Sequence, residues 1–267
     1  MRHLPLPATV AEERAVLAKL AKQAMWAPHL ANWQAAYDAY QLAGGDPHVL
    51  GKSAFDAVTG AAQAKLYEGR RRTVPLEAIR RQVGLLSCPV CGSSSQGSLD
   101  HYLPKDDFGE FSIMRANLVP ACSHCNSDEK GTTYKGVGST RLLHPYYDDW
   151  LDAALWRVRI VPPFAAPTFA PEAMPGLTGS RPAIVAFHLS TVVGRQFQIG
   201  MANWWSTLPA ALSLRLRPPV TGAALDAQLV EDIAVADATT GTNSWQTAAL
   251  RGLATDAAAV ADVLARL

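Results

Sequence analysis

Residues 88–131 read CPVCGSSSQGSLDHYLPKDDFGEFSIMRANLVPACSHCNSDEKG, and they hold every cysteine of the 267-residue chain. The cysteines form two C-x2-C pairs, Cys88 with Cys91 and Cys122 with Cys125. Two such pairs supply the four thiolates of a tetrahedral zinc site, and four thiolates leave no coordination position open. The sequence therefore predicts one structural Zn2+, which stabilises a region too polar to bury a sufficient core alone.

Polar residues lie between the cysteine pairs and directly after the second pair. Asp100 and His101 are adjacent in LDHYLP, a segment with the character of a strand. Neighbouring side chains of a strand point to opposite faces, so a local bend or a strand end is needed if both serve one site. Asn117 lies between the pairs, and Asn126 directly follows the last cysteine, where we expect a helix running toward Lys130. Two strands and a helix, held by zinc, would bring these residues together.

Taken in this order, the cysteine pairs, the Asp-His pair and the two asparagines resemble the HNH endonucleases, in the subgroup with a ββα-metal motif and two C-x2-C zinc knuckles. The resemblance covers residues 85–150. It implies that His101 is the general base and that Asp100 and Asn126 hold a catalytic Mg2+ or Mn2+ through hard oxygen ligands. It also implies that Asn117 braces the active-site loop and that water attacks phosphodiester bonds of DNA.

Basic side chains near the motif are candidates for contacts with the DNA backbone. Lys130 lies in the expected helix, one residue further from the metal-binding asparagine than is usual in the family, and Lys105 follows the Asp-His pair. The basic segment 65–90 supplies the other candidates, Arg70, Arg71, Arg72, Arg80 and Arg81. A solvated surface is the alternative for these arginines, as it is for Arg157 and Arg159, which share one face of an expected strand.

The rest of the chain predicts an α+β protein with mostly helical flanks around this small zinc-stabilised module. A T-x-x-E capping box at Thr9 and apolar residues at helical spacing predict a helical N-terminal region, residues 1–84. The module follows over residues 85–150, and a mixed and then helical C-terminal region covers residues 151–267. The N-terminal helices are expected at residues 8–26, 30–43, 49–70 and 75–83.

In the C-terminal region, apolar residues alternate with arginines from Trp156 to Ile160, which indicates a half-buried strand. A loop rich in proline and glycine is expected at residues 162–182, and a second strand at residues 183–187. Helices are expected after them, at residues 191–213, 223–236 and 243–266.

The module ends in the segment HPYYD, which begins with His144. A histidine before proline and among aromatic residues is more often packed structure than a catalyst, so we expect a structural role for it. We expect Asp148 and Asp149 to be solvated or to cap a helix.

Charge and hydropathy limit the function classes. The net charge of +1 gives no overall field that favours nucleic acid, so the case for DNA depends on the motif. The N-terminus has no apolar segment typical of a signal peptide, and the longest charge-free run, residues 196–214, is too polar to span a membrane. These features predict a cytoplasmic protein with no membrane partner.

The size of the chain also resembles the HNH subunits of Septu-like anti-phage systems. That resemblance implies a role in antiviral defence with a partner ATPase, because the chain has no G-x4-G-K-[ST] loop of its own. The acidic segment 222–267 is the candidate docking face. The alternative is a non-catalytic zinc-bearing adaptor whose helical flanks bind other proteins. An adaptor has no need of Asp100, His101 and Asn126 in this arrangement, which favours the endonuclease.

Overall fold

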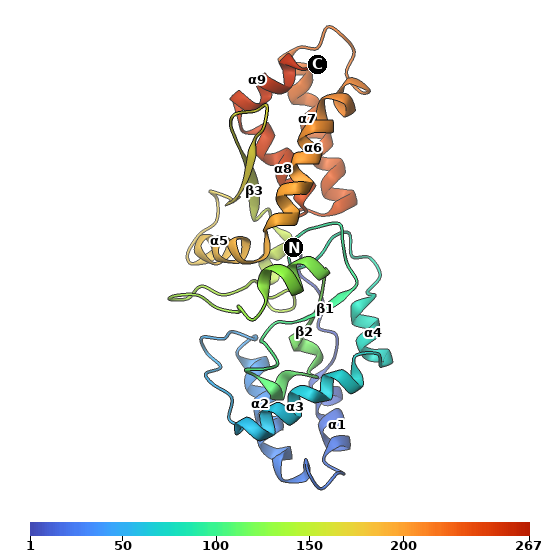
Figure 1. Cartoon of the computed structure of the whole chain (residues 1–267), viewed down its shortest axis with the longest axis vertical. Coiled ribbons are helices and arrows are strands. Elements are labelled where there is room, and N and C mark those ends of the chain that lie inside the picture. Colours follow the sequence, from blue (N-terminus) through green and yellow to red (C-terminus); the bar gives the residue numbers. More distant parts are fainter.

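The computed structural model describes all residues, 1–267 (Figure 1). Its secondary structure is mostly helical, with two small antiparallel sheets of two strands each. The predicted α+β fold with helical flanks is confirmed. None of the helices combines the length and the apolar character that crossing a lipid bilayer requires.

The N-terminal region contains four helices, α1 (Val10–Leu20), α2 (Leu30–Leu42), α3 (Ala57–Arg70) and α4 (Val74–Arg80). The predicted capping box begins α1: the Thr9 hydroxyl accepts the N–H of Glu12, and the Glu12 carboxylate accepts the N–H of Thr9. Helix α3 starts later than expected, because the Asp56 carboxylate caps it by accepting the N–H groups of Val58 and Thr59.

The middle of the chain contains a pair of strands and a short helix. Strands β1 (Ser98–His101) and β2 (Leu118–Ala121) are antiparallel, with Asp100 opposite Val119. A seven-residue π-helix, η4 (His124–Lys130), follows β2 almost directly. The order strand, strand, helix is the order that the sequence predicts for this segment.

The C-terminal region begins with β3 (Trp156–Val161), as predicted, and β3 pairs with β4 (Thr168–Ala173). Strand β3 buries Trp156, Val158 and Ile160 on one face, as the alternating pattern requires. The helices that follow are α5 (Arg181–Val192), α6 (Arg195–Ser213), α7 (Gly222–Thr240), α8 (Trp245–Ala254) and α9 (Ala257–Ala265).

Three predictions for this region are wrong. The expected strand at residues 183–187 is part of α5, whose buried residues Val185 and Leu189 lie one helical turn apart. The second strand is instead β4, which lies inside the segment expected to be a loop. The single helix expected at residues 243–266 is two helices, because the Asp256 carboxylate caps a new helix, α9.

The elements that form the two large hydrophobic cores follow one another along the long axis of the molecule (Figure 1). One core joins the N-terminal helices to the cysteine-rich segment, and it contains Trp33, Tyr37 and Tyr40 of α2. The other core lies among β3, β4 and the helices from α5 to α9, and it contains Trp156 and Phe197. The N-terminal helices and the cysteine-rich segment therefore share a core.

The first cysteine pair lies where the two cores meet. The carbonyl of Val90 accepts a 2.7 Å hydrogen bond from Nε2 of His188, and the carbonyl of Cys91 accepts one of 2.7 Å from the indole of Trp245. Gly92 has a φ of 82°, and a Cβ there would lie 2.3 Å from a backbone oxygen of the C-terminal region. Only glycine fits this approach, so the C-terminal region packs directly on the loop that carries two cysteines.

Candidate metal centre and active site

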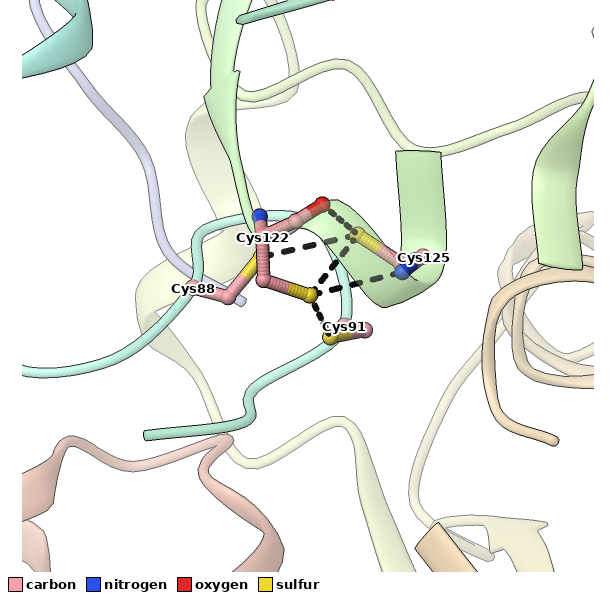
Figure 2. A group of neighbouring side chains, drawn as sticks. All are labelled: Cys88, Cys91, Cys122 and Cys125. Atoms are coloured by element: carbon pink, nitrogen blue, oxygen red, sulfur yellow. Dashed lines mark hydrogen bonds between the residues drawn. The ribbon is translucent and has the colours of Figure 1, made fainter. Parts of the chain in front are cut away.

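The four cysteines converge in one buried cluster (Figure 2). Their sulfur atoms all lie within 4.8 Å of one another, with 3.7 Å between Cys88 and Cys125 and 3.6 Å between Cys91 and Cys122. Tetrahedral coordination with Zn–S bonds of about 2.3 Å requires sulfur atoms about 3.8 Å apart. The cluster therefore has the ligands, the burial and the spacing of a structural zinc site.

Backbone N–H groups point at the sulfur atoms of the cluster. The N–H of Cys122 donates to Sγ of Cys88 at 3.3 Å, and the N–H of Cys125 donates to Sγ of Cys122 at 3.4 Å. Hydrogen bonds of this kind favour the charged form of an acidic group, here the thiolate that a metal requires. One pair precedes β1 and the other joins β2 to η4, so closing the cluster fixes all three elements relative to one another.

Asp100 and His101 end strand β1, and both line the same cleft. Their directions are compatible because the strand stops at His101, which removes the strict alternation of faces that a continuing strand would impose. Asp100 is buried and His101 is half-buried. The strand end that the sequence requires for a shared site is therefore present.

Lys130 lies behind this pair. Its ammonium donates a 3.0 Å hydrogen bond to Oδ1 of Asp100 and a 2.8 Å hydrogen bond to the carbonyl of His101. The Lys130 side chain is only 1% exposed, so the structure places it beneath the cleft instead of on its surface, where a phosphate contact was expected. Burial raises the pKa of Asp100, and the Lys130 ammonium acts against this shift.

Lys130 reaches Asp100 from the last position of a π-helix. A π-turn takes one more residue than an α-turn, because its hydrogen bonds join residues i and i+5. Asn126 and Lys130 both lie within the π-helix η4.

The imidazole of His101 is held in one tautomer. Its Nε2 lies 2.9 Å from the carbonyl oxygen of Ser112, and a carbonyl oxygen can only accept, so Nε2 carries the hydrogen. This leaves the lone pair on Nδ1. The ring of Tyr67 packs edge-on against the imidazole, with 4.5 Å between centroids. Burial lowers the pKa of His101 to about 4, so the ring is neutral at neutral pH.

Asn117 is fully buried and braces the loop between β1 and β2. Its Oδ1 accepts the N–H of Leu103 at 2.8 Å and the hydroxyl of Tyr40 at 3.0 Å, and its Nδ2 donates to the carbonyl of Leu103 at 3.0 Å. The same loop presents the Ser112 carbonyl to His101. Tyr40 was not predicted to have a role, because its position in a helical apolar pattern indicates only a core residue.

His144 is buried within a network of hydrogen bonds. Its Nε2 lies 3.0 Å from the Tyr40 hydroxyl, its Nδ1 accepts the N–H of Tyr146 at 3.2 Å, and its own N–H donates to Asp148 at 2.6 Å. This placement agrees with a structural role. The expectation of a solvated Asp148 is wrong, because its carboxylate is buried and forms an ion pair with Arg141 at 2.7 Å, whereas Asp149 is exposed.

Several of the predicted site residues line one cleft of about 510 Å³. Asn126 lines it with Asp100 and His101. The Asn126 amide nitrogen donates to Oγ of Ser98 at 2.9 Å and to the carbonyl of Leu99 at 3.2 Å. Its Oδ1 has no hydrogen-bond partner in the protein. Asn126 therefore keeps a hard oxygen without a protein partner, in a cleft that Asp100 also lines.

Some of the predicted cationic residues line this cleft and others do not. Those that line it are Arg71, Arg72, Arg80 and Lys105. Arg70 and Arg81 lie outside it, and the Arg81 side chain is 81% exposed. Arg157 and Arg159 belong to β3 in the other core and form ion pairs with Glu172. The structure thus brings together about half of the basic residues that the sequence suggests.

Comparisons with known proteins give limited information. The chain matches no family model and no solved structure. It is 44% identical over 62 residues to protein ea31 of Escherichia phage lambda. The match covers 23% of this chain and 21% of the phage protein, so the chain spans about a fifth of the length of that relative.

Proposed function

We propose that this protein is a metal-dependent HNH endonuclease that hydrolyses phosphodiester bonds of DNA. The observation that carries the proposal is the convergence of Asp100, His101 and Asn126, from a strand end and a separate helix, on one cleft. Three polar groups that differ in chemistry and line one concave surface are typical of an active site.

His101 is the proposed general base. Its Nδ1 has a free lone pair, because Nε2–H is committed to the carbonyl of Ser112. A neutral imidazole fixed in this tautomer can take a proton from a water molecule that attacks phosphorus. Asn117 contributes indirectly, because it holds the loop on which Ser112 lies.

Asp100 and Asn126 are the proposed ligands of a divalent metal. Asp100 keeps one carboxylate oxygen free of Lys130, and Asn126 keeps its Oδ1 free of any protein donor. Two hard oxygen ligands fit Mg2+ or Mn2+ better than Zn2+. When bound, such an ion stabilises negative charge on the phosphate and on the leaving oxygen.

Arg71, Arg72 and Lys105 are the proposed contacts for the phosphate backbone. They line the cleft beside His101, where a strand of DNA must pass to present a phosphodiester to Nδ1. Cationic side chains in such a position supply sequence-independent affinity. Arg80 is less available, because it forms an ion pair with Glu77 and donates to the carbonyl of Arg71 at 2.8 Å.

Plasmid nicking tests the proposal. Zinc-loaded protein should nick supercoiled DNA with Mg2+ and stop when EDTA is added. His101→Ala should lose about 10²–10⁴ in rate while keeping its zinc and its melting temperature. The exposed His48, outside the cleft, provides the matched control His48→Ala, which should cleave at the wild-type rate. Equal activity of His101→Ala and wild type would refute the role of His101, and no nicking by folded, zinc-loaded protein would favour the adaptor.

A defence role with a partner ATPase is a further part of the proposal, and only the resemblance to Septu-like subunits supports it. The acidic helices of the segment 222–267 are the proposed docking face, since they are unsuited to contact DNA. Isolation of the native complex with mass spectrometry of the bound proteins tests this. A chain that elutes alone from its natural host would count against a stable partner.

A further inference from the structure

Lys130 forms a buried ion pair at the point where a divalent metal would bind. Its ammonium lies 3.0 Å from Oδ1 of Asp100, and the two side chains are 1% and 6% exposed. A second hydrogen bond of 2.8 Å joins the ammonium to the carbonyl of His101. Lys130 therefore contacts both members of the Asp-His pair from the side away from the cleft.

This ion pair removes the negative charge that a dication needs. Asp100 and Lys130 together are neutral, and Asn126 adds no charge. Four basic side chains line the cleft, Arg71, Arg72, Arg80 and Lys105, against three acidic ones, Glu77, Asp100 and Asp106, and the charge of Asp100 is offset by Lys130. Without a bound phosphate, the cleft therefore offers a dication no net negative charge.

We propose that Lys130 is a positioning residue that makes divalent-metal binding by Asp100 and Asn126 depend on a phosphodiester in the cleft. This inference rests on the proposed function. The ammonium fixes Oδ1 of Asp100 and so directs the other carboxylate oxygen to the metal. The phosphate supplies the negative charge that Lys130 has cancelled, so the metal and the DNA bind together.

An ion pair that serves only the fold would behave differently. Breaking a buried pair leaves an uncompensated charge and destabilises the protein. It would not change the order in which metal and DNA bind. Metal affinity measured in the absence of DNA therefore separates the positioning role from a purely structural one.

Mn2+ is the probe, and its free concentration is followed by electron paramagnetic resonance with zinc-loaded, full-length protein. All variants carry His101→Ala so that the DNA stays intact, and Mn2+ bound by the duplex alone is subtracted. We expect a 12-base-pair duplex to tighten Mn2+ binding of the Lys130 protein at least tenfold. Without DNA, Lys130→Gln should bind Mn2+ at least tenfold more tightly than the Lys130 protein.

Three further variants make the result specific. Lys65→Gln removes the same charge from an exposed lysine outside the cleft, and we expect its affinity for Mn2+ without DNA to change by less than threefold. Lys130→Arg keeps the charge and should keep weak binding. Lys130→Met also removes the positive charge, and its side chain cannot donate a hydrogen bond to Asp100. If the Met variant unfolds, the conclusion depends on Lys130→Gln, whose amide can still donate.

The outcomes distinguish failure of the role of Lys130 from failure of the proposed metal site. If Lys130→Gln binds Mn2+ no better than the Lys130 protein, while Asp100→Asn abolishes binding with DNA, the role of Lys130 is wrong and the metal site stands. Equal tightening of Mn2+ binding by Lys65→Gln also overturns the inference, because the effect would then come from overall charge. If no variant binds Mn2+ in a saturable way, with or without DNA, both the inference and the proposed metal site fail.

Discussion

The four-cysteine cluster and the Asp100–Asn126 cleft each take one residue from η4, but they differ in how much the rest of the fold contributes. The cluster draws all of its ligands from the loop before β1, the position after β2 and η4, and every cysteine is buried. The cleft depends on groups from elsewhere, including Tyr67 of α3 and the carbonyl of Ser112. One site is closed and self-contained, and the other is open and supported by the rest of the fold.

Loss of one thiolate should have the largest effect. Structural zinc contributes about 10 kcal/mol or more to the folding of small zinc domains, which is comparable with the whole stability of a typical domain. We expect Cys88→Ser to yield little soluble protein, and wild-type protein to hold about one zinc per chain by elemental analysis. Ser123→Ala, an exposed change within the second pair, is the control. A Cys88→Ser variant with normal zinc content and melting temperature would contradict the closed site.

Asn117→Ala tests how strongly hydrogen bonds alone hold the cleft. The change strips both backbone groups of Leu103 and the Tyr40 hydroxyl of their partner, inside a fully buried site. At about 1–3 kcal/mol for each unsatisfied group, we expect a loss of about 4 kcal/mol in urea unfolding. Tyr40→Phe removes one of these bonds and the bond to Nε2 of His144, and it should cost about 2 kcal/mol. Equal costs for the two variants would show that Asn117 does not brace the loop.

His188, which lies where the two large cores meet, should make the stability of the protein sensitive to acid. It accepts the N–H of Leu143 through Nδ1 and donates to Val90 through Nε2, so only the neutral ring satisfies both. Burial lowers its pKa from 6.5 to about 4. Its contribution is therefore complete above about pH 6.5 and is lost as the pH falls toward 4, by up to about 3 kcal/mol. His188→Gln should be less stable at pH 7 and should lose less stability than wild type between pH 7 and pH 5.

Arg72→Ala should have the smallest effect, confined to DNA affinity. Arg72 lines the cleft, and Arg81 lies outside it with an exposed side chain. Loss of one phosphate contact reduces the steepness of the plot of log binding constant for DNA against log salt concentration by about one. We expect this change for Arg72→Ala in fluorescence anisotropy with short duplexes, and none for Arg81→Ala. Identical salt dependence of DNA binding for the two variants would mean that the cleft does not contact the DNA backbone.

The contrast between the two sites also explains what the sequence could predict. Spacing alone determines the cysteine cluster, because its ligands are close in the chain and chemically alike. The convergence of Asp100, His101 and Asn126 also follows from their order around the cysteines. The burial of Lys130 does not, since an exposed and a buried lysine look the same in a sequence. The Ser112 carbonyl is invisible for a similar reason, because every residue has one.

The errors in the C-terminal region have a related cause. Residues 183–187 are a short apolar run, and a run of this length suits a buried strand or one turn of a buried helix equally well. The segment is helical in the structure, because Val185 and Leu189 form a buried helical face that extends beyond residue 187. The burial of Asp148 is hidden from the sequence in the same way, since its partner Arg141 is identified only by the folded chain.

The loop from Val90 to Gly92 determines whether the segment 85–150 can be moved to another protein. The carbonyls of Val90 and Cys91 are bonded to His188 and Trp245, so a fragment cut after residue 150 would expose them and the close-packed surface of Gly92. A fragment cut before residue 85 would lose the helix that carries Tyr40. The segment 85–150 is thus not portable, and a fusion designed around it must carry both flanks.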